Sequence, residues 1–504
     1  MYSRIRSAVC LGIEGREVYV ETDISKGLPS VNVVGLAQTT VMESKDRIKS
    51  AIINSGFNYP RTRVTINLMP AELKKNSSGL DLPMALGMLI SECRAENVST
   101  EELAVIGELT LDGRVRHVKG ALPMMIELKK RGVKKVVVPS GNTEEALMSG
   151  IREIFPVKNL RECVEAISKP ENAYKVSGAG KNKAVQIYDE YTDETMPDFG
   201  DISGQENAKR AVLVAVAGRH GLLMVGSPGC GKTMMAGRIP SVMPAMSSEE
   251  LLQAAVVRSA AGLDSLTSLQ RPFRHPHHTI GPAGLLGGGS NMAQPGEITL
   301  AHNGVLFLDE ICEFNKHVIE GLRIPMEEKK ITHFRKGESY TFPCDFQLVM
   351  ASNPCPCGFF GDKEKECRCS QVDIERYRSK LSGPIMDRVD MKVPMERVTY
   401  NQLSEPGSGM SSKDMRTKIL KAREFATSMG RAGYNSDMTA SDTDKYCRLE
   451  RAERNFMREA YSSLAMSPRA YMRTLRVSRT IADLDLSEII RREHLAEALS
   501  YRMP

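Results

Sequence analysis

The stretch GSPGCGKT, residues 226–233, restricts the fold of this chain more than any other segment. It follows the apolar run GLLMV and precedes MMAGRIP, so it predicts a phosphate-binding loop between a buried strand and a helix. Backbone N–H groups of such a loop surround the phosphates of a nucleotide at the positive end of a helix dipole. Lys232 is expected to neutralise the β- and γ-phosphates, and Thr233 to bind Mg²⁺ through its hydroxyl. The other predicted nucleotide contacts are Gly226, Ser227, Pro228, Gly229, Cys230 and Gly231.

Two further apolar runs, GVLFLDE at 304–310 and FQLVMASNP at 346–354, predict buried strands of the same sheet. Each run ends in polar side chains, which a parallel sheet would bring together at one edge. Asp309 is predicted to hold the Mg²⁺ shell, Glu310 to polarise the attacking water, and Asn353 to orient that water near the γ-phosphate. Together with the loop, these strand ends predict hydrolysis of a nucleoside triphosphate.

At 504 residues the chain should hold several domains, and its sequence pattern divides it into four parts. Residues 1–168 mix alternating strands with helical patterns, and residues 169–197 are polar and predict a linker. Residues 198–400 alternate strands and helices, and residues 401–504 are helical in pattern. No run approaches the roughly 20 apolar residues that span a bilayer, and the first residues lack a signal-peptide core. A cytoplasmic protein without membrane contact is therefore expected.

The order of these motifs resembles an AAA+ ATPase, and more specifically the Mg-chelatase-like branch and its ComM/YifB family. Five segments carry the resemblance: DISGQENAKRA at 201–211, FRHPHHTIGPAGLLGGG at 273–289, PGEITLAHNGVLFLDE at 295–310, YTFPCDFQLVMASNPCPCG at 340–358 and YRSKLSGPIMDRVD at 377–390. The resemblance implies an α/β AAA+ core with a helical lid, ATP and Mg²⁺ as ligands, and a homo-hexameric ring.

Two arginines take catalytic roles by the same resemblance. It makes Arg388 an arginine finger that acts on the nucleotide of a neighbouring subunit, and Arg469 a second sensor on the lid. Phosphoryl transfer uses such extra positive charge in its transition state. The alternative for Arg388 is a structural ion pair with Asp387 or Asp390.

The family pattern also implies two inserts in the ATPase core. One, around 279–298, would line a central pore, and the other is a hairpin at 329–343. Near the turn of that hairpin, Arg335 and Lys336 are predicted to contact DNA phosphates.

The lid offers a second set of basic residues. Its arginines recur along one predicted helix at spacings of 4, 3 and 3 residues, with no acidic residue between them. Arg473 and Arg476 of this stripe are predicted to contact DNA as well. The net charge of +6 permits nucleic-acid binding without indicating it.

The N-terminal region resembles the Lon-type protease domain, an α+β fold shared with domain 2 of ribosomal protein S5. The segment GELTLDGRVRHVKGALPMMIELKKRGVKKVVVPS at 107–140 carries this resemblance. The position of the Lon serine falls on Gly79, and that of the catalytic lysine on Leu122. Because neither residue can act as a nucleophile or a base, the domain is expected to bind or to support rather than to cleave peptides.

Four of the eleven cysteines, Cys355, Cys357, Cys367 and Cys369, form two Cys-x-Cys pairs shortly after Asn353. Four thiolates joined by a turn suit tetrahedral Zn²⁺, although this spacing is tighter than that of most zinc sites. Reduced cysteines on a tight loop and other metal or redox chemistry are the alternatives. The histidine-rich stretch HPHH at 275–278 favours a structural or pore-loop role over metal binding.

The function that these observations favour is an ATP-driven DNA motor. The resemblance implies branch migration of DNA in homologous recombination and natural transformation, with single-stranded or branched DNA as the partner. A protein remodeller that engages polypeptide through the Lon-like domain is the alternative, and a Mg-chelatase-type subunit is a weaker one. Stimulation of ATP turnover by DNA, by unfolded protein or by neither would separate the three.

Overall fold

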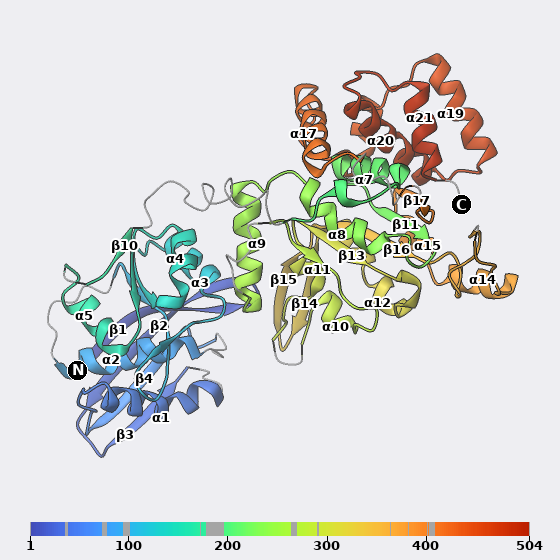
Figure 1. The fold of residues 1–504 in the computed structure, drawn as a ribbon. Coiled ribbons are helices and arrows are strands. Elements are labelled where there is room, and N and C mark those ends of the chain that lie inside the picture. The colour runs from blue at the N-terminus through green and yellow to red at the C-terminus, as the bar shows by residue number, and fades with distance from the viewer. Residues whose placement is uncertain are drawn as a thin grey trace.

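The computed structural model describes residues 2–35, 39–72, 78–93, 101–171, 173–177, 196–263, 270–289, 292–362, 364–381, 383–400, 402 and 409–502. Two α/β units lie next to each other, and a group of C-terminal helices packs on the second unit (Figure 1). The fold is therefore mixed α/β with a helical C-terminal region, as the sequence predicts. Residues 178–195 of the predicted linker lie outside the described residues.

The N-terminal unit is built on a mixed eight-stranded sheet in the order β10-β9-β8-β5-β1-β2-β4-β3. Strands β1, β2 and β4 pair antiparallel, whereas β5, β8 and β9 run parallel to one another. The bounds are β1 Tyr2–Leu11, β2 Glu14–Ser25, β3 Ser30–Val34, β4 Arg63–Met69, β5 Leu103–Val105, β8 Lys135–Pro139, β9 Glu153–Val157 and β10 Val176–Ser177. A separate pair is formed by β6 Glu108–Leu109 and β7 Val115–Arg116.

Helices cover both faces of this sheet. Alternate residues of β1 separate the two cores: Ile5 and Val9 pack with helices α1, α2 and α5, whereas Ala8 packs with α3 and α4. The helices are α1 Thr39–Asn54, α2 Asp81–Cys93, α3 Ala121–Lys130, α4 Thr143–Ser149 and α5 Leu160–Ser168.

The second unit contains a five-stranded sheet in the order β12-β13-β16-β11-β17, and every pair in it is parallel. Its strands are β11 Leu222–Gly226, β12 Phe273–Arg274, β13 Val305–Leu308, β16 Gln347–Ser352 and β17 Met391–Met395. All residues of β13 and β16 are buried, which explains their uninterrupted apolar runs. The carboxyl ends of β11, β13 and β16 therefore lie side by side and present the residues that follow them at one edge.

A hairpin and several helices surround this sheet. The hairpin consists of β14 Lys330–Arg335 and β15 Glu338–Pro343, joined by a two-residue turn. The helices are α7 Glu206–Gly218, α8 Lys232–Val242, α9 Ser248–Ala261, α10 Pro282–Leu286, α11 Glu297–Leu300, α12 Lys316–Glu320, α13 Arg323–Glu328, α14 Gln371–Ser379 and α15 Gly383–Met386.

The C-terminal helices form a lid over α7. Apolar residues of α17 and α20 join the core of the second unit beside α7, and the remaining lid helices share a core of their own. The lid helices are α17 Ser412–Ser428, α18 Ala440–Tyr446, α19 Arg451–Ser463, α20 Pro468–Leu484 and α21 Arg492–Ser500. Among the described helices, none combines the length and the apolarity needed to cross a bilayer.

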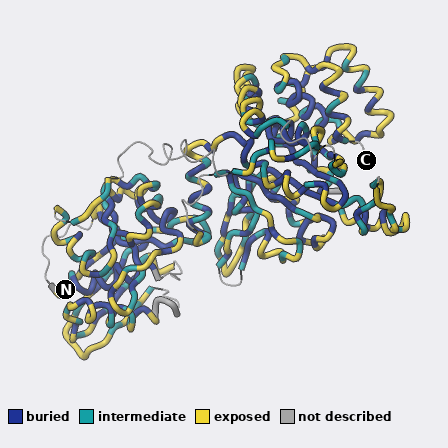
Figure 2. The backbone as a smooth tube through the Cα atoms, in the orientation of Figure 1, coloured by how far each residue is buried: buried dark blue, intermediate teal, exposed yellow. Residues whose placement is uncertain are grey.

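The N-terminal unit contacts the second unit through helix α3 and through the β1–β2 turn. Helix α3 lies against α9, where the Gly120 N–H donates to the Ser259 carbonyl at 2.9 Å. The β1–β2 turn, with Leu11 and Ile13, packs on the buried side chains of Tyr340 and Phe342 in β15. The buried residues of both units are concentrated at their sheets and at the faces that the helices cover (Figure 2).

Candidate nucleotide-binding site

The phosphate-binding loop lies between β11 and α8, as the sequence predicts. Gly229 and Gly231 adopt left-handed φ values of 81° and 94°, which favour glycine, and no atom lies within 4 Å of a Cβ built on either. Lys232 begins α8 and is buried, and its Nζ donates to the carbonyls of Gly226 at 2.6 Å and Ser227 at 3.1 Å. The open glycine backbone beside a buried lysine fits the triphosphate of ATP.

The strand ends bring the predicted catalytic groups to this loop. The Thr233 hydroxyl donates to Asp309 Oδ2 at 2.5 Å, and Lys232 Nζ donates to Asn353 Oδ1 at 3.2 Å. Hydroxyl and carboxylate oxygens are the ligands that Mg²⁺ takes in such sites, so this pair fits the ion. Glu310 follows Asp309 with a left-handed φ of 50°, and its side chain is half exposed. Glu310 therefore stands at the rim, where water can reach it.

A histidine that the sequence analysis did not assign to this site lies beside Glu310. His278 Nδ1 is 3.7 Å from Glu310 Oε2, and the His278 ring lies 4.1 Å from that of His277. His277 in turn contacts the Thr279 hydroxyl at 2.9 Å. The HPHH segment thus joins the catalytic strand end to the start of the pore-type insert. Its only sequence signal was the density of histidines after β12.

A cavity of about 390 Å³ extends from the phosphate-binding loop. Gln205, Met234, Glu364 and Arg397 line it together with the loop glycines. The Gln205 side-chain amide also donates to the Cys230 carbonyl at 3.2 Å, which ties the DISGQ segment to the loop. From the sequence, that segment was recognised only as a family signature, and Glu364 and Arg397 were not predicted to line the nucleotide site.

Arg388 lies at the opposite, amino edge of the sheet. It precedes β17 and forms an ion pair with Glu327, whereas the sequence analysis considered Asp387 and Asp390 as partners. A cavity of about 460 Å³ at this edge is lined by Arg388 together with Arg219 and Lys329. This edge lies at the opposite end of the strands from the phosphate-binding loop, so Arg388 does not lie at the nucleotide site of its own chain.

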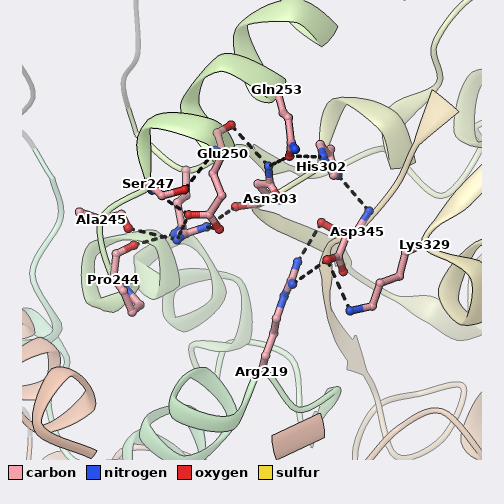
Figure 3. Close-up of polar contacts among 11 residues, drawn as sticks. Arg219, Pro244, Ala245, Ser247, Glu250, Gln253, His302, Asn303, Lys329 and Asp345 are labelled. Atoms are coloured by element: carbon pink, nitrogen blue, oxygen red, sulfur yellow. Dashed lines mark hydrogen bonds and ion pairs between the residues drawn. The ribbon is translucent and has the colours of Figure 1, made fainter. Parts of the chain in front are cut away.

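A polar network connects α9 to this amino edge (Figure 3). His302 Nε2 contacts Gln253 Oε1 at 3.1 Å, and His302 Nδ1 accepts from the Asp345 N–H at 3.1 Å. Burial lowers the pKa of His302 to about 4, so the ring is neutral and can accept at Nδ1. Asp345 then binds Arg219 at 2.9 Å and Lys329 at 3.5 Å. Asp345 therefore holds Arg219 and Lys329, two of the cationic side chains that line this cavity, in place.

The lid arginines of the predicted DNA stripe have protein partners. Arg473 is buried, and its Nη1 donates to the carbonyls of Met386 at 3.1 Å and Val389 at 2.8 Å. Arg476 donates to the Thr443 hydroxyl at 3.3 Å and to a backbone carbonyl. The DNA role of Arg473 and Arg476 therefore stays a prediction that their placement does not support.

Arg469 stands in the first turn of α20 and is exposed. Arg473, one turn further on, contacts the segment that precedes β17. The structure thus brings the predicted second sensor to the side of the core that carries Arg388.

The tip of the β14–β15 hairpin is exposed. Lys336 and Gly337 form the turn with left-handed φ values of 50° and 86°. Arg335 Nε donates to the Gly289 carbonyl of the pore-type insert at 2.8 Å, and the neighbouring Phe334 is 73% exposed. The predicted DNA residues Arg335 and Lys336 are thus placed together with an aromatic ring that the sequence analysis did not select.

The four predicted metal-binding cysteines converge. Their sulfurs all lie within 4.8 Å of one another, and Cys355 Sγ is 3.4 Å from Cys357 Sγ and 3.6 Å from Cys367 Sγ. Backbone N–H groups of Phe359 and Arg368 hold the pKa of Cys357 at about 6. Four sulfurs at this spacing, with thiolate character favoured at Cys357, are a donor set that fits Zn²⁺. Cys369 completes the set.

The Lon-like region offers no peptidase site at the two aligned positions. Leu122 is fully buried in α3, and its N–H donates to Ser259 Oγ of α9 at 3.3 Å. The Gly79 carbonyl accepts from the Gly107 N–H at 3.0 Å. The position that holds the base in Lon is thus part of the contact between the two units.

Three family models match the chain. The model described as subunit ChlI of Mg-chelatase matches residues 20–142, the model of magnesium chelatase, subunit ChlI, matches residues 198–403, and that of the ChlI C-terminal part matches residues 409–502. The protein YifB of Escherichia coli and the competence protein ComM of Haemophilus influenzae are each 37% identical to this chain, over 99% of it and 97% of their own lengths. Lon protease 2 of Bacillus subtilis is 26% identical over 40% of each chain.

The parallel sheet, its phosphate-binding edge and these matches define an ATPase of the Mg-chelatase-like AAA+ class. The likeness to YifB and ComM extends over nearly the whole length of both partners, N-terminal region included. The chain therefore belongs to the ComM/YifB family.

Proposed function

We propose that this protein is an ATP-driven DNA motor that works as a cytoplasmic hexameric ring. Its action would be that of a helicase or translocase in branch migration, during homologous recombination and natural transformation. The observation that carries the proposal is the exposed tip of the β14–β15 hairpin, where Phe334, Arg335 and Lys336 stand together. The name of the relative from Haemophilus influenzae, a competence protein, supports the process.

The nucleotide chemistry follows from the carboxyl edge of the sheet. Lys232 would exchange its carbonyl partners for the β- and γ-phosphates, and Thr233 and Asp309 would hold Mg²⁺. The ion, when bound, neutralises charge that develops on the phosphate oxygens. Glu310 would take the proton of the attacking water, and Asn353 would orient that water. The phosphates would have to compete with these carbonyl contacts for Lys232.

The amino edge supports the proposed ring. Arg388 would leave Glu327 and approach the γ-phosphate of the adjacent subunit, with Arg469 on the same side. Each subunit then depends on its neighbour for the positive charge of the transition state. A ring of such sites can pass conformational change from one subunit to the next.

The hairpin supports the proposed DNA path. Arg335 and Lys336 would contact phosphates, and Phe334 offers a face for stacking on an unpaired base. The Arg335 contact with Gly289 ties the hairpin to the insert that begins next to His278 and Glu310. DNA bound at the hairpin would therefore be linked to Glu310 through the pore-type insert and His278.

Zinc is proposed as the metal of the four-cysteine cluster. Zn²⁺ forms tetrahedral sites with four thiolates, and such sites serve folding rather than catalysis because no coordination position stays open. We expect about one zinc ion per chain, which elemental analysis of protein prepared without chelator measures.

The motor proposal is tested by ATP-dependent movement of a labelled four-way DNA junction. The wild-type protein should convert the junction to products, and Glu310→Gln should bind it without conversion. If the protein moves no DNA but hydrolyses ATP faster in the presence of unfolded protein, the protein-remodeller hypothesis replaces the motor. Mass photometry with and without ATP tests the ring.

A further inference from the structure

The loop between the two cysteine pairs lies directly against the phosphate-binding loop. Gly358 has a left-handed φ of 83°, and a Cβ built on it would come within 2.6 Å of Pro228 Cδ and 3.9 Å of Asn353 Cγ. The Asp362 carboxylate accepts a hydrogen bond from the Ser227 hydroxyl, and this bond is the main cause that lowers the pKa of Asp362 to about 2. Both contacts fall on residues of the phosphate-binding loop.

The same loop supplies one wall of the nucleotide cavity. Arg397 Nε lies 2.9 Å from Asp362 Oδ2, and the Arg397 guanidinium lies 5.5 Å from the centroid of the Phe359 ring. Arg397 and Glu364 line the cavity of about 390 Å³ beside Gly231. The loop therefore meets the phosphate-binding loop at Ser227 and Pro228, and its Glu364 lines one side of the cavity.

Besides the cysteine cluster, the Asp362 carboxylate orders this loop: it accepts from the N–H groups of Glu364 and Lys365 and pairs with Arg397. The loop's described residues from 356 to 369 form neither helix nor strand, and 364–366 are exposed. The cysteine sulfurs lie at both ends of this segment, so a metal bound to them would close it into a short ring. Closing a short loop removes most of its alternative conformations, and metal sites contribute folding free energy in this way.

We propose that the metal of the four-cysteine cluster is a structural part of the nucleotide site: it holds residues 358–362 against Ser227 and Pro228 and thereby sets the affinity for ATP. The inference rests on the proposed zinc site and is independent of the DNA activity. Loss of the metal would release the loop, widen the cavity at Arg397 and leave the phosphate-binding loop without its support.

Two glycines of the loop provide a matched pair of variants. Gly358→Ala and Gly361→Ala both place a side chain at left-handed φ, 83° and 79°, but no atom lies within 4 Å of a Cβ at Gly361. Only Gly358→Ala therefore presses on Pro228. With all cysteines intact, we expect both variants to keep zinc, and Gly358→Ala to bind ATP about tenfold or more weakly than Gly361→Ala. Titration with a fluorescent ATP analogue, in a Glu310→Gln background that prevents turnover, measures this difference.

Cys367→Ser tests the metal itself, with Cys10→Ser in the N-terminal unit as its control. We expect Cys367→Ser to lose zinc and to weaken ATP binding by a similar factor, and Cys10→Ser to change neither. Adding Gly358→Ala to Cys367→Ser should cost little further affinity, because the released loop can move away from Pro228.

Equal ATP affinity in the two glycine variants, or wild-type affinity in zinc-free Cys367→Ser, would overturn the inference. The glycine pair decides alone if Cys367→Ser does not fold. A wild-type protein without zinc would overturn the proposed metal site and the inference together. If the wild type contains zinc but the loop variants bind ATP as tightly as their controls, the inference is overturned and the metal site is kept.

Discussion

The two edges of the five-stranded sheet differ in how their charged groups are paired. At the carboxyl edge, Lys232, Thr233 and Asp309 contact one another or Asn353 within the same chain. At the amino edge, Arg388 binds Glu327, and Arg473 is occupied by backbone carbonyls. On the proposed function, a single subunit would bind ATP by itself but would need the arginine of a neighbour for hydrolysis. The predictions below test that division.

The largest effect is expected at the carboxyl edge. Lys232→Ala should abolish ATP binding, because no other side chain of the loop can neutralise the β- and γ-phosphates. Titration with a fluorescent ATP analogue measures it. ATP affinity near that of the wild type would show that the carboxyl edge is not the nucleotide site.

Glu310→Gln separates binding from hydrolysis at the same edge. The variant should bind ATP and assemble, yet turn it over at least about a hundredfold more slowly, because the general base is gone. Phosphate release measures turnover, and analytical centrifugation measures assembly. Turnover within a few-fold of the wild type would remove Glu310 from the chemistry.

Arg388→Ala tests the amino edge. ATP binding should stay intact and turnover should fall by a factor of about a hundred or more, since the arginine acts on the nucleotide of a neighbour. Mixing this variant with Lys232→Ala subunits should restore some activity, because a mixed ring can contain complete sites. If no mixing ratio restores any turnover, the amino edge does not complete the neighbouring site.

The smallest effect is expected at the hairpin, which belongs to neither edge. Changing Arg335 and Lys336 together to glutamine should lower DNA-stimulated turnover and spare the basal rate. The slope of log affinity against log salt should also flatten by about two contacts for each engaged subunit. Binding is measured with the Glu310→Gln protein, which should hold ATP. An unchanged slope together with unchanged stimulation would place DNA elsewhere.

The carboxyl edge could be predicted from the sequence, and the amino edge largely could not. Asp309 and Asn353 each follow an apolar run, and parallel strands bring such positions together whatever lies between them in the chain. The partner of Arg388 was not predictable in this way. Glu327 lies at the end of α13, and no periodic pattern relates that helix to β17. The sequence offered only the neighbouring aspartates as partners.

The stripe of lid arginines shows a second limit. A spacing of three and four residues places Arg473 and Arg476 on one helix face, but it does not say whether that face meets solvent or protein. In α20 this face is turned toward protein. Arg473 donates to backbone carbonyls before β17, and Arg476 donates to Thr443 of the lid. The contact of Gly358 with Pro228 had no sequence signal at all, since it joins two loops of irregular backbone.

Stimulation of the ATPase by DNA is measured as ATP turnover of the wild-type protein with and without branched DNA at fixed salt. We expect turnover to rise with single-stranded or branched DNA, and Arg335→Gln/Lys336→Gln to lose most of the rise at an unchanged basal rate. Turnover that is the same with every DNA tested, together with no DNA binding by the ATP-bound Glu310→Gln protein, would contradict the proposed DNA motor.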